Sequence, residues 1–310
     1  MNKFDSFNFN QTLPIINEET EFFPLLTQQD EDEMRNAEIP DQLPILPLRN
    51  TVLFPGVVIP ITVGRDKSIK LVKDAYKGDR TIAVVSQKDM SVEDPNFDQL
   101  NKVGTVAHII KILQMPDGNT TVIIQGKQRV KLKELVQTEP YLIARVEKFP
   151  EDKPKTSSKE FKALISSVKE MALQIIQLSP NLPSEAGIAI KNIESPTFLV
   201  NFISSNLSLE LEQKQDLLEI KDFVKRAKQL LEHLTTEIQM LELKNQIQNK
   251  VRIDLDKQQR DYFLSQQLKT IQEELGGNTP DLEIEELKKR AKAKKWRDDV
   301  GKHFQKELEK

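Results

Sequence analysis

The sequence contains no cysteine, and this absence already excludes several kinds of chemistry for its 310 residues. Without cysteine there is no disulfide framework, no thiolate nucleophile and no cysteine-ligated zinc. Histidine is nearly as scarce, because only His108, His233 and His303 are present. They lie far apart, and none has a partner at a metal-ligand spacing such as HExxH. The composition therefore argues against thiol and zinc chemistry.

Long hydrophobic runs and an excess of one charge are also missing. No apolar run reaches the roughly 18 residues that a membrane span requires, and the polar start MNKFDSFNFNQ does not resemble a signal peptide. The 45 basic and 48 acidic side chains nearly cancel, which leaves no overall field that would gather nucleic acid. We expect a cytoplasmic protein with no membrane partner, in which any binding of nucleic acid is local and weak.

Catalytic motifs are absent as well. There is no GxxxxGK[ST] phosphate loop and no GxSxG elbow, and Gly301-Lys302 has no glycine-rich loop before it. We expect His108 to be a hydrogen-bonded strand residue and His233 to be a solvated position beside a helical seam. The many carboxylates suggest solubility and pairing with lysines. We therefore predict no catalytic, cofactor-binding or metal-binding residue.

What is present indicates two or three folded units of the α+β class, since a single core rarely exceeds about 300 residues. The first 42 residues carry ten carboxylates without an apolar period, which is typical of a flexible arm. The sequence predicts a flexible acidic arm (1–42), a β-rich domain (43–149), a polar linker (150–160), a helical bundle (161–221), a long coiled-coil-like helix (222–275) and a Gly/Pro break with a charged helix (276–310).

In the β-rich domain, short β-branched or alternating stretches predict an antiparallel sheet, either a small barrel or a curled sheet. Pro116, Asp117 and Gly118 supply turn chemistry for a hairpin, and 65–77 has the apolar spacing of one helix. The strands are expected at 57–63, 81–85, 104–114, 119–126, 128–136 and 141–149.

The helical part carries clear start signals. Ser157 with Glu160 forms a plausible capping box, and Ser195 followed by Pro196 predicts another helix start. Between Thr197 and Leu275 there is neither glycine nor proline, which favours a helical array. The coiled-coil seam is expected at Val224, Ala227, Leu231, Leu234, Ile238 and Leu241, with a shifted register at Ile247, Val251 and Leu255 and again at Leu264, Leu268, Ile271 and Leu275.

Two basic clusters are candidates for phosphate contacts. Arg129, Lys131 and Lys133 share one face of a predicted strand, where an ordinary solvent face is the favoured interpretation because no aromatic residues are interleaved. The second cluster is flanked by carboxylates, which favours a charged helix surface. It comprises Lys288, Lys289, Arg290, Lys292, Lys294, Lys295 and Arg297.

Two segments resemble Lon-family ATP-dependent proteases. The first, LPILPLRNTVLFPGVVIPITVGRDKSIKLV (43–72), is similar to the opening of the family's N-terminal domain. The second, QQRDYFLSQQLKTIQEELGG (258–277), is similar to the helix that leads to the family's ATPase module. The resemblance implies a PUA-like barrel, a helical subdomain and a long helix, in a protein that assembles as a homohexamer.

This resemblance also implies a role. In the family, the N-terminal region helps to capture unfolded or damaged proteins and supports assembly, whereas the ATP and Mg²⁺ site and the Ser-Lys peptidase dyad would follow residue 310. No cofactor is expected in this chain. Two other functions remain open: a freestanding PUA-like protein that binds RNA or a small ligand, and a structural coiled-coil adapter.

Overall fold

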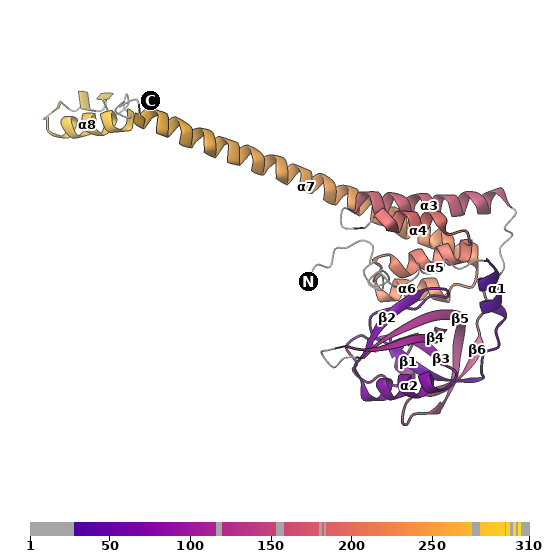
Figure 1. Ribbon diagram of the computed structural model, residues 1–310. Coiled ribbons are helices and arrows are strands. Elements are labelled where there is room, and N and C mark those ends of the chain that lie inside the picture. The colour runs from indigo at the N-terminus through magenta and orange to yellow at the C-terminus, as the bar shows by residue number, and fades with distance from the viewer. Residues whose placement is uncertain are drawn as a thin grey trace. The chain divides into compact units, whose positions relative to one another are not determined.

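The computed structural model describes residues 28–115, 120–152, 158–179, 182, 184–274, 280–294, 296–297, 300–301 and 303–304 (Figure 1). The chain forms two compact units, residues Met1–Leu243 and Lys244–Lys310. The elements are α1 (Gln28–Asn36), β1 (Gln42–Leu48), β2 (Val58–Val63), α2 (Asp66–Lys77), β3 (Thr81–Ser86), the 3-10 turn η2 (Phe97–Gln99), β4 (Val103–Gln114), β5 (Thr120–Gln137), β6 (Ile143–Lys148), α3 (Lys159–Leu178), α4 (Ser184–Asn192), α5 (Pro196–Asn206), α6 (Leu211–Glu219), α7 (Phe223–Glu274) and α8 (Pro280–Lys292).

The six strands form one mixed sheet in the order β2-β5-β4-β3-β1-β6. All pairings are antiparallel except β1 with β3. Strand β5 also pairs with β6, so the sheet curls back on itself, while β2 pairs only with β5 and lies outside this circuit. The α+β class and the curled sheet are confirmed, but the sheet is not a clean barrel.

Alternation along the strands gives the sheet two apolar faces. Leu43 and Ile45 belong to one buried cluster within the curled sheet, whereas Leu46 and Leu48 belong to a second one. The second cluster is continuous with the core of the helices, which includes Val168 and Leu230. Figure 1 shows α3 to α6 gathered beside the sheet, so the sheet and the helical bundle of the first unit share one core.

The Phe54-Pro55-Gly56 turn, part of the segment that resembles Lon proteases, has a structural role. Gly56 adopts a positive φ of 82°, which glycine tolerates without steric cost. Gly126 approaches so closely that a Cβ there would lie 2.3 Å from the Phe54 carbonyl oxygen. The Asn201 amide donates a hydrogen bond to the Pro55 carbonyl oxygen at 3.0 Å, which ties the turn to α5.

Helix starts follow the local chemistry that the sequence contains. The Ser195 hydroxyl accepts a hydrogen bond from the Phe198 N–H, and Pro196 occupies the first turn, as predicted. Helix α3 is capped by Ser158, so the predicted cap, Ser157, is wrong by one residue and itself lies outside the described residues. The Asp222 carboxylate accepts a hydrogen bond from the Lys225 N–H and caps α7.

Helix α7 has 52 residues and, at ~1.5 Å per residue, a length of about 80 Å. Its bounds agree with the predicted long helix to within one residue at each end. The buried stripe of its first part differs from the predicted seam, because it contains Phe223, Arg226 and Leu230 in place of Val224 and Leu231. No helix in the described part of the chain is long and apolar enough to cross a membrane.

Two further expectations change. Residues 28–36, expected to be part of a flexible arm, form α1, and the predicted strands 119–126 and 128–136 are one 18-residue strand. The hairpin joins β4 to β5 through the pair Gln114–Thr120, although its turn lies outside the described residues, as does the Gly/Pro break after α7.

Candidate functional site

The histidines do not form a reactive cluster. Among the described residues there is no group of three or more His, Cys, Asp or Glu side chains that could hold a metal ion. His108 lies on β4 opposite Thr81, where burial and the nearby Lys127 lower its pKa. His233 is half-buried beside the seam, and its Nε2 atom is buried without a hydrogen-bond partner in the described structure. His303 is exposed.

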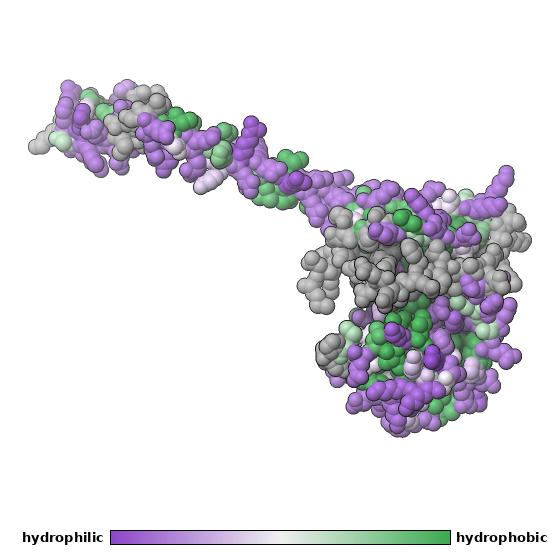
Figure 2. Space-filling model, viewed as in Figure 1, coloured by the Kyte–Doolittle hydropathy of each residue, from purple (hydrophilic) through white to green (hydrophobic). Residues whose placement is uncertain are grey.

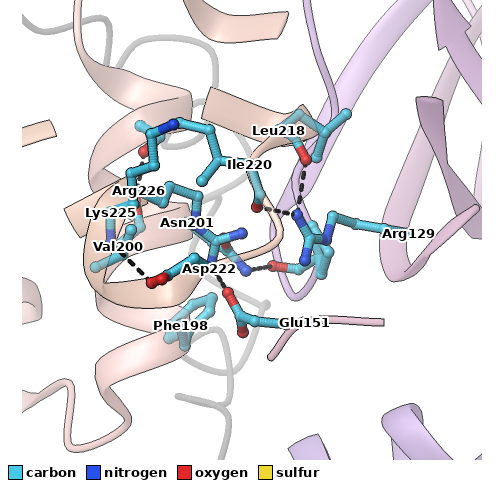
Figure 3. A network of polar contacts seen from close by, with 12 residues as sticks. Arg129, Glu151, Phe198, Val200, Asn201, Leu218, Ile220, Asp222, Lys225 and Arg226 are labelled. Carbon is cyan, nitrogen blue, oxygen red and sulfur yellow. Dashed lines mark hydrogen bonds and ion pairs between the residues drawn. The ribbon is translucent and has the colours of Figure 1, made fainter. Parts of the chain in front are cut away.

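A buried network of charged side chains joins the sheet to the helical bundle (Figure 3). Arg226, in the first turn of α7, forms an ion pair with Glu151, which follows β6. Only 1% of the Arg226 side chain and 13% of the Glu151 side chain are exposed. Burial lowers the pKa of Arg226, and the Glu151 carboxylate opposes this shift. The pair therefore places a compensated charge inside the protein.

Arg129 of β5 belongs to the same network. Its Nη1 donates hydrogen bonds to the carbonyl oxygens of Leu218 at 2.8 Å and Ile220 at 2.7 Å, which end α6. Burial and the neighbouring Arg226 lower the pKa of Arg129 to about 10. The expected solvent face of Arg129, Lys131 and Lys133 is thus wrong for Arg129, because the helical bundle covers it. The basic face that motivated an RNA-binding alternative therefore loses its arginine.

A second polar contact fixes α6 on the sheet. The Ser86 hydroxyl donates to the Gln215 amide oxygen at 2.7 Å, and the Gln215 amide nitrogen donates to the Val103 carbonyl oxygen at 2.9 Å. Both side chains are buried. Buried polar groups with satisfied hydrogen bonds specify one arrangement of the elements that they join. The sheet and the helices of the first unit therefore act as one support for the start of α7.

The later part of α7 presents apolar side chains to solvent. From Ile247 onward, nine large hydrophobic residues of this helix are each more than half exposed. Figure 2 shows green apolar patches interleaved with hydrophilic residues along α7. The nine residues are Ile247, Val251, Ile253, Leu255, Tyr262, Phe263, Leu264, Leu268 and Ile271, and we call them the α7 apolar face. Exposed apolar surface of this kind marks interaction sites.

The basic cluster near α8 agrees with a charged helix surface. Lys288, Lys289 and Arg290 are exposed on α8, and Arg290 lies 3.7 Å from Glu286 one turn earlier. Lys295 lies outside the described residues. Exposed pairs of this type contribute little to stability and leave the lysines hydrated.

A cavity of about 380 Å³ lies between α1 and the sheet. Asp30, Glu33 and Met34 line it from α1. Val106, His108 and Lys127 line it from β4 and β5. This cavity could not be predicted from the sequence, because it depends on a helix inside a segment that was expected to be irregular.

Comparison with known proteins identifies the family. Residues 42–236 match the model of the ATP-dependent protease La (LON) substrate-binding domain. The chain is 56% identical over 301 residues to the Lon protease of Flavobacterium johnsoniae. This alignment covers 97% of this chain and 37% of that protein. It is 54% identical over 293 residues to the Lon protease of Cytophaga hutchinsonii, with 94% of this chain and 36% of that protein covered.

A solved structure has the same fold. The N-terminal domain of the Mycobacterium avium complex Lon protease matches with a TM-score of 0.53 and 22% identity, covering 63% of this chain and 98% of that chain. The chain thus spans 36% to 37% of the length of the two Lon proteases compared above. From the match over residues 42–236, we conclude that the chain belongs to the Lon protease family and carries the substrate-binding domain of that family.

Proposed function

We propose that this chain is the non-catalytic part of a Lon-type ATP-dependent serine protease that engages unfolded or damaged proteins and supports assembly of identical subunits. The observation that carries the proposal is the α7 apolar face, whose nine side chains are each more than half exposed. Family membership supports the first role, since residues 42–236 match a substrate-binding domain.

Exposing apolar surface to water costs roughly 25 cal/mol for each Å². A helix that keeps nine such side chains exposed gains free energy when another apolar surface covers them. Unfolded proteins offer exposed apolar segments, and a second copy of α7 offers the same stripe, so both are suitable partners. Neither interaction requires a catalytic group in this chain.

We assign ATP and Mg²⁺ binding and peptide-bond cleavage to parts of the longer relatives that this chain does not span. We also propose that the chain acts in the cytoplasm as part of a homohexamer. The purified chain should hydrolyse neither ATP nor casein. Turnover of either substrate, at a rate that follows the protein through purification, would refute this assignment.

The test uses the full chain with Val251→Asp and Leu268→Asp, which place two charges on the α7 apolar face. The control is Gln246→Asp with Thr270→Asp, which adds the same charge at two exposed positions that are not three or four residues from any member of that face. Analytical ultracentrifugation measures self-association, and fluorescence anisotropy measures binding of labelled, reduced and alkylated α-lactalbumin. We expect the first variant to weaken both at least tenfold and the control to change neither. The proposal would be contradicted if the two variants showed the same self-association and the same binding of α-lactalbumin.

A further inference from the structure

We propose that the groove between α1 and the sheet is a docking site for acidic, helix-forming protein segments, and that α1 is the chain's own, displaceable occupant. The groove is lined by residues of α1, the segment that follows it, β3, β4 and β5, none of which belongs to the α7 apolar face. The proposal goes beyond the function above and can fail or succeed independently of it.

The sheet holds α1 by the backbone at its C-terminal end. The Gln128 amide nitrogen donates to the carbonyl oxygens of Met34 and Ala37, and Lys148 Nζ donates to the Ala37 oxygen at 2.9 Å. Every α-helix ends in carbonyl oxygens without helical partners, and a cation there is favoured by the helix dipole. These contacts therefore recognise the backbone of a helix end and do not depend on the side chains of α1.

Charge determines which helices fit. Residues 30–33 of α1 are four consecutive carboxylates, with Arg35 as the one cation of the helix. On the sheet side, burial lowers the pKa of Lys127, and the attraction of Asp30 opposes this shift. A partly buried lysine is stabilised in its charged form by a carboxylate placed opposite, so the groove favours an acidic segment over a neutral or basic one.

The contacts that keep α1 in the groove are weak enough for another segment to displace it. Helix α1 has nine residues, too few to be stable alone in water. Met34 is its only large apolar side chain, and a cavity of about 380 Å³ remains beside it. Val106, Ala107 and Ile39 also line this space. A segment with bulkier apolar residues fills the space that α1 leaves and buries more surface.

One contact fastens α1 outside the groove and offers a way to release it. The Glu31 carboxylate lies close to the Ser195 hydroxyl and the Phe198 N–H at the start of α5, and both groups lower its pKa. Burial nevertheless raises the pKa of Glu31, so this contact is made at the cost of desolvation. Replacing Glu31 and Met34 by alanine loosens α1 while it leaves the sheet side of the groove unchanged.

The experiment uses the full chain and a fluorescent peptide with the sequence of residues 27–39, TQQDEDEMRNAEI, carrying citrulline in place of arginine. We expect Glu31→Ala with Met34→Ala to bind this peptide at least tenfold more tightly than the wild type, because the groove is then vacant. Adding Lys127→Glu and Lys148→Glu should abolish the gain. Adding Lys102→Glu and Lys111→Glu, exposed positions that do not line the groove, should preserve it.

The rate of trypsin cleavage after Arg35 measures how often α1 leaves the groove and unfolds. Excess peptide should increase the cleavage rate of the wild type several-fold, whereas a peptide with lysine at its acidic positions should leave the rate unchanged. The proposal fails if the Glu31→Ala, Met34→Ala chain is cut at the wild-type rate, because α1 is then a fixed element. It also fails if a single-stranded RNA of equal charge competes as well as the acidic peptide, since the groove would then accept any polyanion.

Discussion

The two parts of α7 use the same kind of sequence in opposite ways. Up to Leu241, the apolar stripe that includes Leu230, Leu234 and Ile238 is buried in the core of the first unit. From Ile247 onward, an apolar stripe of similar spacing is exposed. The first unit even buries a charged residue on this helix, Arg226, while the later part leaves leucine and phenylalanine in water. Burial on α7 is therefore set by what covers each segment and not by its hydrophobicity.

The difference shows what each part contributes. Buried side chains at the start of α7 fix the helix to the sheet and the bundle, so they contribute to the stability of the first unit. Exposed side chains further along add nothing to the stability of a single chain, and their free energy becomes available only on association. Substitutions in the two parts should therefore affect different measurements.

The largest expected effect is that of Glu151→Gln, which keeps the shape of the side chain but removes the charge that balances Arg226. Breaking a buried ion pair from one side costs about 3–5 kcal/mol, because the remaining charge is left uncompensated. We expect a loss of this size in the free energy of unfolding, measured by urea denaturation followed by circular dichroism.

Two comparisons make this result interpretable. Glu147→Gln removes the partner of the exposed Lys133 and should leave the free energy of unfolding almost unchanged. Glu151→Gln combined with Arg226→Met removes both buried charges and should recover part of the stability. An equal loss for Glu151→Gln and Glu147→Gln would mean that the buried pair does not hold α7 to the first unit.

The next effect contrasts two leucines of α7. Leu234 is fully buried, and Leu234→Ala should lower the free energy of unfolding by about 2–5 kcal/mol through lost apolar contact and a cavity. Leu264 is 51% exposed, and Leu264→Ala should change the free energy of unfolding by less than about 0.5 kcal/mol at low protein concentration. Urea denaturation of both variants measures the difference. If Leu264→Ala were as costly as Leu234→Ala in a monomer, the later part of α7 would be packed against its own chain.

The sequence predicted those features of the fold that depend on local patterns. The bounds of α2 and α7 are correct to within one residue because both helices lack interior glycine and proline and are bounded by clear signals. The curled sheet followed from β-branched strands and short connections. Helix α1 was missed because it contains one large apolar residue, so it has no apolar stripe for a sequence pattern to reveal.

The contacts between elements could not be predicted in the same way. Arg129 alternates with Val130 as a solvent-facing residue would, but the end of α6 and the Phe149 ring lie against its guanidinium group and bury it. Arg226 lies three residues after Phe223 and four before Leu230, so its position on the buried stripe could have been noticed from helical spacing. A charged side chain is expected to be exposed when the sequence is considered alone. Arg226 can be buried because Glu151, 75 positions earlier in the chain, supplies the compensating charge.

The smallest effect concerns a partly buried lysine for which the described structure provides no carboxylate partner. Lys214 of α6 donates a hydrogen bond to the Ser205 carbonyl oxygen at 2.7 Å, and burial lowers its pKa to about 8. In the unfolded chain the same lysine titrates near its ordinary value of 10.5. Between these two values the folded state binds fewer protons than the unfolded state, so this group makes the free energy of unfolding rise with pH.

The slope from one such group is at most about 1.4 kcal/mol per pH unit. Lys214→Met removes it, so the stability of the wild type relative to this variant should increase when urea denaturation is repeated at pH 9.5 instead of pH 7.5. A constant difference between the two proteins would show that Lys214 keeps its proton in the fold. Arg226 is more deeply buried and stays charged because Glu151 faces it, whereas Lys214 has only a carbonyl oxygen and loses its proton more readily. The buried cation of α7 is therefore accompanied by a buried carboxylate, whereas the partly buried lysine of α6 is not.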